Sequence, residues 1–69
     1  MDIRMLKDQN ELEYRYGLGL VETNRTLKKG QLYYVKLIRE NDEYISIETM
    51  SFFGTTSESQ IPKDSFKEE

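Results

Sequence analysis

Residues 12–20 read LEYRYGLGL, with a large apolar or aromatic side chain at every second position. A period of two places these side chains on one face of a β-strand, whereas a helix would spread them around its axis. Gly17 and Gly19 fall on the opposite face, where glycine favours a bend, a bulge or a close backbone approach. The stretch therefore predicts a strand with one buried face.

Further strands are predicted on both sides of short polar breaks. Residues 31–39 are rich in aromatic and β-branched side chains on both faces, which favours a central strand. Residues 44–50 follow a connector of hairpin length and form its expected partner. A second turn is expected at residues 54–57, just after Phe52 and Phe53, and a short strand at 58–61 ends at Pro62. Lys63-Asp64-Ser65 then fits a single helical turn.

These patterns predict one all-β domain over residues 1–69, a small barrel of about five strands with one short 3-10 turn. Residues 1–10 are expected to be an N-terminal extension or an extra strand, and residues 67–69 a frayed tail. The expected core consists of Leu18, Leu20, Val35, Leu37, Ile45, Ile47 and Phe66.

The composition excludes several classes of function. The chain has 69 residues and contains neither histidine nor cysteine, so it lacks the usual nucleophilic pairs and the ligands of a structural zinc site. We therefore expect no enzyme, no cofactor and no metal. The net charge of −3 disfavours a general phosphate-backbone binder. No apolar run is long enough to span a membrane and no signal peptide is recognisable, so we expect a cytoplasmic protein with no membrane partner.

The order of motifs resembles that of SH3 domains over residues 12–66. Residues 12–16 (LEYRY) resemble the opening ALYDY-type strand, and residues 27–30 (LKKG) are similar to the step that ends the long first loop. Tyr44 falls near the peptide-binding tryptophan, and Ile61-Pro62 resembles the step before the helical turn, after which Phe66 begins the last strand. The resemblance implies an SH3-like barrel. Because the tryptophan is absent and Ser65 replaces an expected tyrosine, the departures argue against a conventional proline-rich ligand.

Two groups of residues are candidates for binding a protein. The resemblance implies a groove with Tyr14, Tyr16, Tyr44 and Pro62, although the period of two alone favours Tyr14 and Tyr16 in the core. Glu40, Asp42, Glu43 and Glu48 form an acidic stretch that either meets a basic partner or simply keeps the hairpin solvated.

The leading hypothesis is a non-catalytic protein-interaction module. Its small size and acidic surface suit a phage-type modulator or inhibitor that covers a functional surface of a host protein. The alternative is a nucleic-acid-binding barrel of the KOW or Tudor type, with stacking tyrosines and phosphate contacts from the basic group Arg25, Lys28, Lys29 and Lys36. A structural subunit of a larger assembly is a third possibility.

Overall fold

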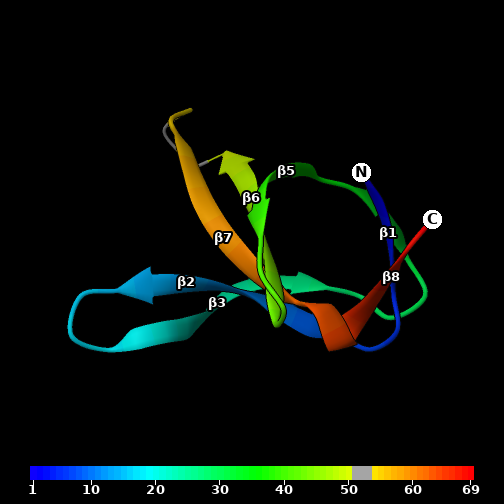
Figure 1. Cartoon of the computed structure of the whole chain (residues 1–69), viewed down its shortest axis with the longest axis horizontal. Helices are drawn as coiled ribbons and strands as arrows, with labels where there is room; N and C mark the ends of the chain where they lie inside the picture. Colours follow the sequence, from blue (N-terminus) through cyan, green and yellow to red (C-terminus); the bar gives the residue numbers. More distant parts are fainter. Residues whose placement is uncertain (51–53) are drawn as a thin grey trace.

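The computed structural model describes residues 1–50 and 54–69 and shows an all-β chain with two sheets (Figure 1). In those residues the strands are β1 (Asp2–Met5), β2 (Gln9–Arg15), β3 (Gly19–Leu27), β4 (Leu32–Tyr34), β5 (Lys36–Glu40), β6 (Tyr44–Met50), β7 (Thr56–Pro62) and β8 (Phe66–Glu68). A 3-10 turn, η1 (Lys63–Ser65), follows Pro62 as the sequence predicts. The predicted number of about five strands is wrong, because two of the predicted strands are each divided and the N-terminal segment adds β1.

Within the described residues, the chain passes between the two sheets four times, from β1 to β2, from β3 to β4, from β4 to β5 and from β7 to β8. The smaller sheet has the order β4-β1-β8 and the larger one the order β3-β2-β7-β6-β5. Val35 separates β4 from β5, and η1 separates β7 from β8, so each of these consecutive pairs contributes to both sheets. Such pairs of consecutive strands thus lie in different sheets, and the apolar faces of both sheets pack around one core.

Among the residues that the structure describes, the core contains four of the expected residues and four others. Val35, Ile45, Ile47 and Phe66 are buried, which confirms their prediction. The remaining buried apolar side chains are Ile3, Met5, Leu27 and Ile61. Ile3 and Met5 come from β1, the strand considered only as an extension or an extra strand, yet it is the central strand of the smaller sheet.

The LEYRYGLGL stretch is a hairpin rather than one strand. β2 ends at Arg15 and β3 begins at Gly19, and the Leu18 N–H donates to the Arg15 carbonyl at 3.0 Å. Gly17 has a φ of 79°, the left-handed value that the third residue of a type II turn requires. The prediction of Leu18 in the core is therefore wrong: it lies at the tip with 74% of its surface exposed, and Leu20 is only half-buried.

The predicted central strand at residues 31–39 is also divided, and both halves lie at edges. β4 is an edge of the smaller sheet and β5 an edge of the larger one. Because β5 pairs only with β6, its side chains remain accessible, and Leu37 is 40% exposed instead of belonging to the core. Phe52 and Phe53 lie outside the described residues.

The expected frayed tail is instead part of a sheet. Lys67 and Glu68 of β8 pair with Arg4 and Ile3 of β1, and the Glu69 N–H donates to the Asp2 carbonyl at 2.9 Å. The two ends of the chain thus lie side by side, away from the β2–β3 hairpin (Figure 1). Residues 1–50 and 54–69 include no helix with the length and apolar character needed to cross a membrane.

Candidate binding surface

Tyr44 and Pro62 form the centre of the candidate surface. Tyr44 begins β6, Pro62 ends β7, and the two residues are direct partners across the antiparallel pair. Both side chains are half-buried. They line an open pocket together with Asp42, Glu43, Lys63 and Asp64. An aromatic ring and a proline ring thus lie beside a largely acidic rim.

Tyr14 reaches this centre from the hairpin. β2 pairs with β7 through Leu12 and Gln60, which brings Tyr14 to the same face of the larger sheet as Tyr44. Tyr14 and Tyr44 together line a second pocket next to the first. A side-chain hydrogen bond with Tyr14 raises the pKa of Tyr44 above its ordinary value, and desolvation and the negative charge of Glu43 act in the same direction.

The acidic loop between β5 and β6 is held in one conformation. Asn41 Oδ1 accepts hydrogen bonds from the N–H groups of Glu43 and Tyr44 at 2.8 and 2.9 Å. The Asn41 N–H donates to the Tyr44 carbonyl at 3.0 Å, and the Lys63 N–H donates to the Glu43 carbonyl at 2.8 Å. These bonds fix the backbone that carries Asp42 and Glu43, so their carboxylates are presented from an ordered loop.

Asp42 and Glu43 are the available charges of this surface. Neither carboxylate forms an ion pair with any residue in the described ranges 1–50 and 54–69. Glu40, by contrast, binds Lys63 Nζ at 2.7 Å. Two free negative charges next to the aromatic rings favour a positively charged ligand.

The structure brings together most of the predicted site residues. Those that meet around the two pockets are Tyr14, Tyr44, Pro62, Glu40, Asp42 and Glu43. Tyr16 is fully exposed at the hairpin tip, and Tyr14 is 63% exposed, so the alternative that both tyrosines face the core is wrong. Glu48 lies in a different pocket and pairs with Lys36 at 3.2 Å.

The basic group considered for phosphate contacts is partly neutralised. Arg25 lies 3.5 Å from a carboxylate oxygen of Glu11 and 3.9 Å from one of Glu13. Lys36 is paired with Glu48, as stated above. Lys28 and Lys29 remain exposed after β3. Two of these four cations are therefore already engaged with acids of the same chain.

Gln60 is a residue of this region that the sequence patterns did not reveal. Its side chain is buried under the pocket that Tyr14 lines, and its Nε2 donates to Glu58 at 3.0 Å. Glu58 also accepts two hydrogen bonds from Arg39, at 2.5 and 2.7 Å. In a short strand of alternating polarity, a glutamine is predicted to be an exposed polar residue. The sequence therefore does not indicate the burial of Gln60.

No protein-family model matches this chain, and neither a curated protein nor a solved structure matches it. Within residues 1–50 and 54–69 there is no group of three or more acidic side chains that could hold a metal ion. In the described part of the chain, the surface around Tyr44 combines aromatic rings with unpaired acidic charge.

Proposed function

We propose that this chain is a non-catalytic protein-interaction module that binds a basic segment of a partner protein. The Tyr44 surface, defined as Tyr14, Tyr44, Pro62, Glu40, Asp42 and Glu43, is the binding face. The observation that carries the proposal is the pair of unpaired carboxylates, Asp42 and Glu43, fixed beside the two tyrosines.

The two parts of the surface have different roles in this proposal. Tyr14 and Tyr44 supply large contact area at a low entropy cost, so they are the energetic anchors. The carboxylates of Asp42 and Glu43 attract a basic partner from a distance and act mainly on the association rate. Binding then works by occupancy: the module covers the partner's basic surface and excludes its other ligands, as a phage-type inhibitor of a host protein does.

The path of the chain supports an SH3-like barrel as part of the proposal. A long hairpin precedes the strand that is divided between the two sheets, and a 3-10 turn precedes the last strand. We assign the Tyr44 surface to the groove that the SH3 resemblance implies, with Tyr44 in the region of the missing tryptophan.

The test is affinity capture from a native lysate, with and without nuclease treatment, followed by binding kinetics on the captured protein. Tyr44→Ala is expected to raise the dissociation rate. The double variant Asp42→Lys/Glu43→Lys is expected to slow association, with an effect that shrinks as salt rises through about 0.1–1 M.

A matched control carries the same change of charge on the other sheet. Asp2 and Glu68 are exposed and form no ion pair within the described part of the chain, so Asp2→Lys/Glu68→Lys should leave both rates within about twofold of the unmodified protein. If both double variants slow association equally, the effect depends on net charge alone. That result would contradict the assignment of the Tyr44 surface as the binding face. Binding that disappears with nuclease treatment would favour the nucleic-acid alternative.

A further inference from the structure

The β2–β3 hairpin is attached to the rest of the larger sheet over a very short length. β2 and β3 pair with each other from Gln9–Leu27 to Arg15–Gly19, but β2 meets β7 at one residue pair, Leu12–Gln60. Beyond that pair the hairpin projects from the two sheets as an arm (Figure 1). Its angle therefore depends on side-chain contacts at its base.

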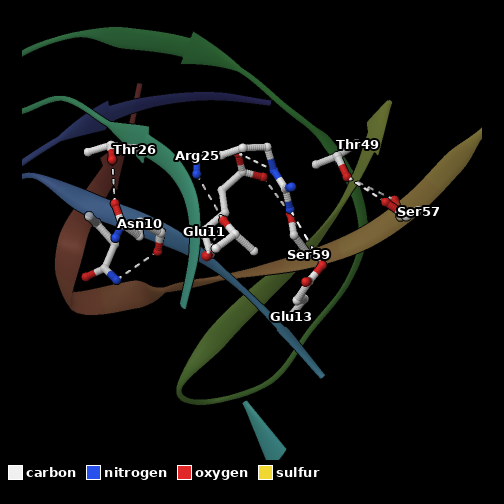
Figure 2. Close-up of polar contacts among 10 residues, drawn as sticks. Asn10, Glu11, Glu13, Arg25, Thr26, Thr49, Ser57 and Ser59 are labelled. Carbon is white, nitrogen blue, oxygen red and sulfur yellow. Dashed lines mark hydrogen bonds and ion pairs between the residues drawn. The ribbon is translucent and has the colours of Figure 1, made fainter. Parts of the chain in front are cut away.

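A buried carboxylate lies at that base. Glu11 is 7% exposed, and its Oε1 accepts a hydrogen bond from Ser59 Oγ at 2.6 Å. Its other oxygen, Oε2, lies 3.5 Å from Arg25 Nε. Because Glu11, Arg25 and Ser59 belong to β2, β3 and β7, this one side chain connects both strands of the arm to the body (Figure 2).

The backbone at the same position strengthens the connection. Thr23 Oγ1 donates to the Glu11 carbonyl at 2.8 Å, and the Arg25 N–H donates to Thr23 Oγ1 at 3.2 Å. These contacts span the irregularity in register where β3 passes Glu11. Hydrogen bonds have a preferred direction, so they fix an angle that an apolar contact leaves adjustable.

A buried carboxylate contributes little net stability, because the free-energy cost of its desolvation offsets much of what its ion pair contributes. The position of Tyr14 shows what this arrangement achieves. Tyr14 lies three residues after Glu11 on the same strand, and it lines a pocket together with Tyr44.

We propose that Glu11 is the positioning residue of the Tyr44 surface. Its bonds to Ser59 and Arg25 hold the arm at the angle that places Tyr14 against Tyr44. The biological meaning of this inference rests on the proposed function, but its test uses the chain alone and needs no partner.

The first measurement follows the angle of the arm. The chain has no cysteine, so the double substitution Leu18→Cys/Lys67→Cys introduces two unique labelling sites, one at the exposed tip and one on β8. Spin labels at these sites report the tip-to-body distance distribution by pulsed electron resonance. In this labelled background Glu11→Gln, which keeps an oxygen acceptor for Ser59, should retain a narrow distribution, whereas Glu11→Met should broaden it.

The second measurement follows the contact that the arm makes. The hydrogen bond with Tyr14 raises the pKa of Tyr44. Ring-carbon chemical shifts followed during an alkaline titration would measure this pKa in each variant. In Glu11→Met this pKa should move toward the ordinary tyrosine value, because Tyr14 is no longer held in place. In Glu11→Gln it should stay raised.

A core variant separates positioning from general loss of stability. Ile3→Val removes one buried methylene from the smaller sheet and leaves the base of the arm unchanged. It should change neither the distance distribution nor the Tyr44 pKa. If Glu11→Met does not fold, Ser59→Ala replaces it and should broaden the distribution in the same way. An unchanged distribution with an unchanged Tyr44 pKa, or equal broadening by Ile3→Val, would overturn the proposal.

Discussion

Ile61 of β7 has no exposed surface and packs opposite Ile45 in the apolar core. Leu18, in contrast, is held out at the hairpin tip with most of its surface in solvent. The two residues have similar apolar surface, so their different burial decides how much each one contributes to the stability of the fold.

Ile61→Ala should lower the free energy of unfolding by about 2–5 kcal/mol, because it removes buried methylenes and leaves a cavity. Leu18→Ala is the matched control and should change it by less than about 0.5 kcal/mol. Urea unfolding followed by circular dichroism measures both. Similar losses in the two variants would contradict the burial described for these side chains.

The raised pKa of Tyr44 has a consequence at alkaline pH. Its folded state favours the neutral phenol, so the corresponding stability is present below the ordinary pKa of 10.0 and is lost as pH rises through the raised value. Tyr14→Phe removes the hydrogen bond that is the main cause of the shift. The variant should therefore show a lower Tyr44 pKa and a shallower loss of stability above pH 10.0. A Tyr44 pKa that is the same in both proteins would show that Tyr14 does not cause the shift.

At the scale of elements, the alternation of apolar and polar residues predicted β6 correctly but did not reveal the β2–β3 hairpin. β6 was predictable because Ile45 and Ile47 point inward and polar residues alternate with them. Tyr14, Tyr16 and Leu18 keep the same alternation through a turn, so the period alone could not show that the chain reverses at Gly17.

The residues of the candidate surface were predictable from their types, but their assembly was not. Tyr14 and Tyr44 share one face because β2 pairs with β7, a register that depends on contacts distant in sequence. Glu11 and Gln60 are polar residues in buried positions, and polarity patterns assign such residues to the outer face. Burial of this kind depends on partners such as Ser59 that only the folded chain supplies.

The loop between β5 and β6 depends on one side-chain amide. Asn41→Ala should lower the free energy of unfolding by about 1–2 kcal/mol, because two backbone N–H groups lose their acceptor. Asn41→Asp keeps an oxygen at this position and should cost less. Urea unfolding measures the stabilities, and hydrogen exchange of the Glu43 and Tyr44 amides reports the loop directly. Equal stability and equal exchange in both variants would contradict the role of Asn41 Oδ1.

At the scale of the whole molecule, the smaller sheet joins the two ends of the chain. Arg4 of β1 binds the Glu69 carboxylate through Nε at 2.5 Å and also donates to the Gly30 carbonyl at 2.9 Å. The Met1 ammonium group donates to the Val35 carbonyl at 2.9 Å. Contacts between residues far apart in sequence therefore close the fold around β1.

The Arg4–Glu69 pair gives this closure a dependence on pH. The hydrogen bond from Arg4, assisted by the charges of Arg4 and Lys67, holds the pKa of Glu69 below its ordinary value of 4.5. Because the pKa of Glu69 is lower in the folded state, its ionised carboxylate stabilises the fold above pH 4.5. This stability is lost as the pH falls through the pKa of the folded state. Glu69→Gln should therefore be less stable than the unmodified protein at neutral pH, and the difference should disappear on acidification. Thermal unfolding at several pH values measures it, and a difference independent of pH would contradict the linkage.

The antiparallel pairing of β1 with β8 also determines how the chain responds to tension. Asp2 and Glu69 emerge at the same end of that ladder, so a force that separates the two termini loads its backbone bonds one after another. The bond from the Glu69 N–H to the Asp2 carbonyl lies at the end of this ladder next to the termini, and the pairs further along follow. We therefore expect the β1–β8 pair to open from its joined ends, one backbone bond at a time, before the strands that carry the Tyr44 surface are loaded.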